Sequence, residues 1–123
     1  MSTPNQRSAL SALDAARPTI SRLDLSRDPE DIAADLLDGW SGTETALRAL
    51  MGGSSLGGQP LIRELRQRDL ITLDTAHALL EFQAARDRAG RTEYRPTSTD
   101  IAAARNALVA LDADLAGAPA SAA

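Results

Sequence analysis

The stretch from residue 28 to residue 51, DPEDIAADLLDGWSGTETALRALM, carries the clearest structural signal in the chain. Its apolar face recurs at steps of three and four residues: Ile32, Leu36, Trp40, Thr43, Leu47 and Leu50. This spacing has the period of a helix and fits no strand. Asp28 suits the N-cap and Pro29 suits the first helical position, so we predict a helix that begins here and ends at Met51, with Trp40 in the core.

Two glycines interrupt this helix. Gly39 and Gly42 each cost about 0.8 to 1 kcal/mol relative to alanine in a helix interior, so a compensating contact is expected. Together with Ala46 and Ala49 they form a stripe of small side chains. The stripe predicts the close approach of another helix.

Three further helices are predicted downstream. Gly-rich residues 52–60 are expected to be a flexible connection to a short helix over 61–69. A helix capped by Thr72 runs towards Gly90. The last begins with a capping box from Thr97 to Asp100. Its apolar seam is Ile101, Ala104, Leu108, Leu111 and Leu115. Short links between helices predict an all-α fold, an antiparallel four-helix bundle with a short second helix.

The two ends of the chain lack an obvious apolar face. Residues 1–27 are predicted to be a loosely ordered arm, in which a short helix over 8–17 would end at Pro18. The bundle domain is expected to span 28–116, and the Ala-, Gly- and Pro-containing residues 117–123 are expected to be a disordered tail.

Composition excludes several chemistries. The 123 residues include no cysteine, which removes disulfides, thiolate zinc sites and cysteine nucleophiles. All 13 basic residues are arginine, so no lysine is present to serve a phosphate loop or a Schiff base. No apolar stretch is long enough for a signal peptide or a membrane span, so we expect a cytoplasmic protein without a cofactor.

Two groups of side chains could supply metal ligands. His77 and Glu81 share a helix face, but two ligands are too few, and a surface or structural role is favoured. Asp31, Asp35 and Asp38 also share a face, yet no second carboxylate pair with suitable spacing accompanies them. The sequence therefore predicts no metal site and a solvated acidic face.

The main basic cluster is Arg86, Arg88, Arg91 and Arg95. It could meet phosphates, but Asp87 and Glu93 lie among these arginines, the net charge is −4 and few aromatic side chains can stack on bases. Nucleic-acid binding is therefore disfavoured. We expect the cluster to pair with the acidic start of the helix at residue 28, within the chain or across a subunit interface.

The layout from Leu61 to Leu115 resembles the HEPN superfamily, helical bundles found in many prokaryotic defence and toxin systems. In that family an arginine, usually followed by Asn, Asp or His, precedes a histidine by four to six residues, and dimerisation joins two such motifs into a ribonuclease site. Arg86-Asp87 matches the first half, whereas Arg91 stands where the histidine is expected. The resemblance implies a symmetric dimer and argues against nuclease activity in this chain.

These observations favour a non-catalytic helical interaction module that forms a homodimer, in a prokaryotic defence or toxin–antitoxin-like system, with an unknown protein partner. The interface is predicted on two apolar faces: Gly39, Gly42 and Ala46, and Ile101, Leu108 and Leu115. The alternative is an RNA-binding protein or HEPN-like ribonuclease with a non-standard site at Arg86, Asp87 and Arg91.

Overall fold

A computed structural model describes residues 3–121 and, among these, the side chains of residues 3–116. This part of the chain forms five helices and no strand, which confirms the all-α class. The helices are α1 (Pro4–Ser21), α2 (Pro29–Leu50), α3 (Gly58–Gln67), α4 (Leu73–Ala89) and α5 (Ser98–Ser121).

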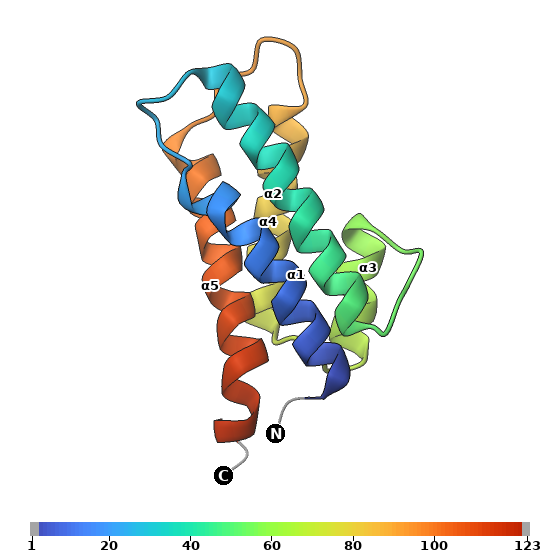
Figure 1. Cartoon of the computed structure of the whole chain (residues 1–123). Coiled ribbons are helices and arrows are strands. Elements are labelled where there is room, and N and C mark those ends of the chain that lie inside the picture. The colour runs from blue at the N-terminus through green and yellow to red at the C-terminus, as the bar shows by residue number, and fades with distance from the viewer. Residues whose placement is uncertain (1–2, 122–123) are drawn as a thin grey trace.

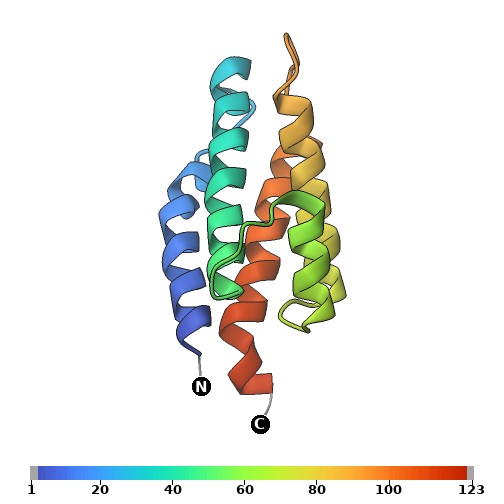
Figure 2. The same ribbon diagram turned by 90° about the vertical axis from the view of Figure 1, so that its right-hand side faces the viewer.

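The four long helices alternate in direction, and the chain begins and ends at the same end of the bundle (Figure 1). Packing is most extensive between α1 and α2 and between α4 and α5, while contacts of α2 with α4 and of α1 with α5 close the ring. The short helix α3 flanks α4 on the outside and runs antiparallel to it (Figure 2).

Helix α1 corrects two predictions, because the bundle has a fifth helix and residues 4–21 are not a loose arm. Thr3 and Gln6 form a capping box that starts the helix. Its buried stripe, at helical spacing, is Ala9, Leu13, Ala16 and Ile20. Pro18 lies inside the helix without ending it, because a proline in the last turn removes little of the hydrogen-bond ladder.

The glycines of α2 explain how α1 packs so closely. A Cβ atom at Gly42 would lie 2.6 Å from the Cβ of Ala16, and one at Gly39 would lie 3.1 Å from Cγ1 of Ile20. The predicted approach of another helix to this stripe is therefore confirmed. The approaching helix is α1 of the same chain.

The core lies between the long helices. Trp40 is buried, as predicted, and meets Phe82 edge to face at a centroid distance of 5.3 Å. The caps at Thr72 and Thr97 are confirmed, whereas Asp28 occupies the N-cap position of α2 without a side-chain cap bond.

Two helix ends differ from the prediction. Helix α3 begins at Gly58, so the connection from α2 is shorter than expected. Helix α5 continues to Ser121 instead of ending near Leu115. The rest of the predicted disordered tail, residues 122–123, lies outside the described residues, as do all side chains from residue 117 onward. No helix in the described part of the chain has the length and apolar character needed to cross a bilayer.

Candidate functional site

The corner between α4 and α5 is organised around Asp100, whose side chain is completely buried. Its carboxylate accepts hydrogen bonds from the Arg88 guanidinium, from the Tyr94 hydroxyl at 2.6 Å and from the backbone N–H of Thr97 at 2.9 Å. Burial alone would raise the pKa of Asp100, but these hydrogen bonds and the charge of Arg88 together lower it. Asp100 therefore holds the corner as a carboxylate.

The predicted basic cluster is divided by this arrangement. Arg88 forms an ion pair with the buried Asp100, while Arg86, Arg91 and Arg95 are exposed. Of these, Arg95 lines a pocket together with Asp28 and Glu30 at the start of α2. This places one arginine of the cluster near the acidic residues with which the sequence predicted it to pair. No ion pair joins Arg95 to these acids in the part of the chain that the structure describes.

Arg86, Asp87 and Arg91, the positions of the incomplete HEPN-like motif, lie exposed at the end of α4. The Arg86 Nη1 atom is 3.5 Å from Asp87 Oδ1, a loose contact between neighbours. His77 lies more than two turns earlier on the same helix. The structure therefore brings no histidine of this chain to the Arg86 end of α4.

The acidic face of α2 is not uniformly solvated as predicted. Asp31 and Asp38 are exposed, but Asp35 is only 4% exposed. Arg22 binds both of its oxygens at 2.9 Å, and Arg27 binds one at 2.6 Å. Hydrogen bonds from Arg22, followed by those from Arg27, lower the pKa of Asp35 despite its burial. Position 35 follows Ile32 by three residues and precedes Leu36, so its place on the apolar side was visible in the sequence.

Metal binding finds no support in the described residues, which contain no group of three or more His, Asp or Glu side chains placed to hold an ion. His77 and Glu81 are both exposed on α4.

The predicted dimer interface is wrong, because its residues lie inside this chain. Gly39 and Ala46 are buried and Gly42 meets Ala16. On α5, Ile101 is 6% exposed, Leu115 is 1% exposed and Leu108 packs partly buried against the core.

An apolar groove instead runs between α3 and α4, with a volume of about 410 Å³. Its walls have helical spacing on both sides: Gln59, Ile62, Arg63 and Arg66 from α3, and Leu73, Ala76, His77 and Leu80 from α4. Ile62 and Ala76 are buried and form the floor, whereas Leu73 is 56% exposed and Leu80 is 36% exposed.

Charge in the groove is uneven. Arg63 and His77 are exposed at its edges. Arg66 donates through Nη1 to the carbonyl of Ile71 at 2.9 Å and lies 3.6 Å from Asp69. Its lining residues include no carboxylate, so the groove is apolar with a basic wall on α3. Sequence reasoning missed it, although the adjacent Leu79 and Leu80 point about 100° apart on a helix and do not share one buried face.

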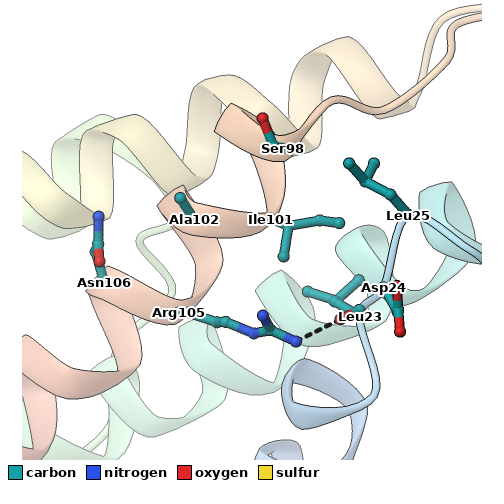
Figure 3. Close-up of a pocket in the computed structure, with 8 residues that line it drawn as sticks. All are labelled: Leu23, Asp24, Leu25, Ser98, Ile101, Ala102, Arg105 and Asn106. Carbon is teal, nitrogen blue, oxygen red and sulfur yellow. Dashed lines mark hydrogen bonds between the residues drawn. The ribbon is translucent and has the colours of Figure 1, made fainter.

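A second cleft, of about 500 Å³, separates the α1–α2 connection from α5 (Figure 3). Leu23, Leu25 and Ile101 converge on it, and Arg105 donates through Nη2 to the carbonyl of Leu23. Asp24 lies at its rim, where hydrogen bonds from Ser26 lower its pKa. Arg105 therefore ties the connection to α5, which is a structural role.

No family model, curated protein or solved structure matches this chain.

Proposed function

We propose that this chain is a non-catalytic protein–protein interaction module that forms a homodimer through the α3–α4 groove. The observation that carries the proposal is the exposure of leucine side chains above a buried apolar floor. Two helices that present a groove at steps of three and four residues are a common docking site for a third helix.

Exposed apolar surface is concentrated on this side of the molecule. Among the described residues, the large hydrophobic side chains that remain exposed are Leu25, Leu70, Leu73, Leu80 and Val109. Leu73 and Leu80 line the groove, and Leu70 lies in the α3–α4 connection. Full burial of one leucine is worth roughly 1.5 to 3 kcal/mol, so covering this patch would supply a substantial part of a binding energy.

The two buried carboxylates, Asp35 and Asp100, support a structural and not a catalytic role for the charged groups inside the bundle. Asp35 and Asp100 are each neutralised by arginine, and both pKa values are lowered. A carboxyl group that acts as an acid or base near neutral pH usually has its pKa raised instead.

The test is the mass of the purified chain in solution, measured by light scattering after size-exclusion chromatography. We expect about twice the protomer mass of 12.9 kDa. Leu73→Asp and Leu80→Asp should give monomers, because each places a charge in the interface. Val109→Asp is the matched control, since Val109 is 67% exposed on α5, away from the groove. A wild-type monomer at the highest soluble concentration would overturn the homodimer.

A role in RNA processing is the second candidate, favoured by the exposure of Arg86, Arg91 and Arg95 at one end of the molecule. RNA cleavage by the purified chain that Arg86→Ala abolishes would support it over the non-catalytic module. A place in a prokaryotic defence system is proposed on the basis of the HEPN resemblance.

A further inference from the structure

Helix α3 is the least anchored of the five helices in the described part of the chain. Within that part it packs only against α2 and α4, on the outside of the bundle (Figure 2). It spans 10 residues, and an isolated helix of this length is marginal in water. Its helical form therefore depends on the docking of Leu61, Ile62 and Leu65, which are buried.

The two ends of α3 are joined to the bundle in different ways. After α3, a short turn leads to α4; in it Asp69 has a φ of 56°, and Arg66 Nη1 donates to the carbonyl of Ile71 at 2.9 Å. Before α3, the connection from α2 contains Gly52 and Gly53, with φ values of 79° and 104°. A Cβ atom at Gly53 would meet nothing within 4 Å. The turn is therefore suited to be a pivot, and the glycine connection leaves room for movement.

Helix α2 supplies the contacts that hold the first turn of α3. The N-cap residue Gly57 has no side chain that could cap the helix. Glu44 of α2 replaces that cap, because its carboxylate accepts a hydrogen bond from the backbone N–H of Gly58 at 2.8 Å. Arg48 of α2 donates through Nε to the carbonyl of Leu56 at 2.8 Å. Both side chains are only partly buried, so water can compete for these bonds.

The docked position of α3 also leaves a polar atom unsatisfied. The carboxamide of Gln83, on α4, lies against the first residue of α3, since a Cβ atom at Gly58 would be 2.9 Å from its Nε2 atom. Among the described side chains, Gln83 Oε1 is the one buried nitrogen or oxygen atom without a hydrogen-bond partner. A buried acceptor without a partner destabilises the state that buries it.

We propose that α3 is a hinged lid, which opens about the turn at residues 68–72 when its contacts with Glu44 and Arg48 break. The other four helices stay folded during opening, because α1, α2, α4 and α5 close a ring of packing without α3. Opening hydrates the Gln83 carboxamide, but it also exposes the buried leucines of α3, so the closed form predominates.

The lid controls the groove between α3 and α4. One wall of the groove is α3 itself, so the groove exists only while the lid is closed. A molecule that binds in the groove therefore favours the closed lid. The lid goes beyond the proposed homodimer, because it acts in the same way on a second copy and on any other occupant.

Amide hydrogen exchange of the intact chain tests the lid, at a protein concentration low enough to leave the groove uncovered. Undocked α3 loses its helical hydrogen bonds, so its amides should be protected at least about tenfold less than those of α2 and α4. Equal protection of all three helices, lost only when the whole chain unfolds, would overturn the lid whether or not the chain dimerises.

Two substitutions should shift the lid in opposite directions. Glu44→Ala removes a contact that exists only in the closed form, and it should lower the protection of α3 about fivefold. Gln83→Met replaces the unsatisfied carboxamide by an apolar side chain of similar length, and it should raise the protection of α3 by about fivefold or more. Unchanged protection in both variants would contradict the roles of these residues.

A mild core substitution outside the lid is the discriminating control. Ile20 is buried on α1, which stays folded whether the lid is open or closed. Ile20→Val should therefore lower the protection of the most protected amides of α1 and α2 about three- to tenfold and leave that of α3 unchanged. A parallel loss in α3 would show that α3 opens only with the whole molecule, and would refute the lid.

Discussion

Asp100 shows how a single carboxylate can fix the junction of two helices. It caps α5 through Thr97, binds Tyr94 and neutralises Arg88, all from a fully buried position. Removing Arg88 leaves this charge without its partner. Arg88→Ala should therefore cost roughly 2 to 4 kcal/mol, somewhat below the range for fully buried pairs because Arg88 is 32% exposed.

Acid titration checks the role of Asp100. Its folded-state pKa is lowered, so its contribution to the free energy of unfolding is fully present above the ordinary value of about 3.9 and is lost as the pH falls through the folded pKa. Asp100→Asn should be less stable than wild type at neutral pH, with the difference narrowing below about pH 4. Urea unfolding across this range measures it. Asp31→Asn, at an exposed position on α2, should cost much less stability at neutral pH, and an equal loss in both variants would contradict this role.

Gly42 shows the opposite case, in which the absence of a side chain is the structural feature. Gly42→Ala gains about 1 kcal/mol in helix propensity, but the new methyl group would meet the Cβ of Ala16 and force α1 away from α2. Overpacking of this kind costs about 1 to 3 kcal/mol, so we expect net destabilisation. In an Ala16→Gly background the added methyl group has room, and the same substitution should then stabilise the chain. Thermal unfolding of the four variants tests this, and equal effects of Gly42→Ala in both backgrounds would show that the contact is unimportant.

At the scale of the helix, the starts of α4 and α5 were predictable because their caps are local. Thr72 and the pair Thr97 and Asp100 make the bonds that their sequence spacing indicates. Helix α1 was predicted only as a short helix over 8–17 in a loose arm, because its buried stripe contains two alanines, Ala9 and Ala16, which look weak as apolar signals. Ala16 packs closely because α2 offers Gly42 opposite it.

We expect α1 to unfold with the whole molecule and not before it. Leu13 is fully buried, so Leu13→Ala should cost about 2 to 5 kcal/mol, whereas Ser11→Ala, on the exposed side, should cost little. Trypsin should cut after Arg22 no faster than the protein unfolds globally, since Arg22 caps the end of α1 and is paired with Asp35 at 2.9 Å. Rapid cleavage at this bond in the native protein would instead support the prediction that residues 1–27 are loosely ordered.

At the scale of the whole molecule, the wrong interface follows from treating residues 1–27 as a loose arm outside the core. With α1 left out of the core, the small side chains of α2 and the seam of α5 seemed to lack partners inside the chain. The structure covers both, and the unpartnered apolar surface lies on α3 and α4 instead. The helical class could be read from periodicity, but which face stays exposed depends on how many helices share the core.

Dimerisation through that surface should be visible in the stability of the protein. Because a dimer that unfolds to two separate chains is stabilised by mass action, its unfolding midpoint rises with protein concentration. For a chain of this size we expect a rise of roughly 2 to 4 °C for each tenfold increase. Leu80→Asp should abolish the dependence, because it places a charge on the groove face of α4. Val109→Asp should retain it, since Val109 lies outside the groove on α5. Scanning calorimetry over a hundredfold range of concentration measures these slopes, and a wild-type midpoint that does not move would mean that folding and self-association are not coupled in this chain.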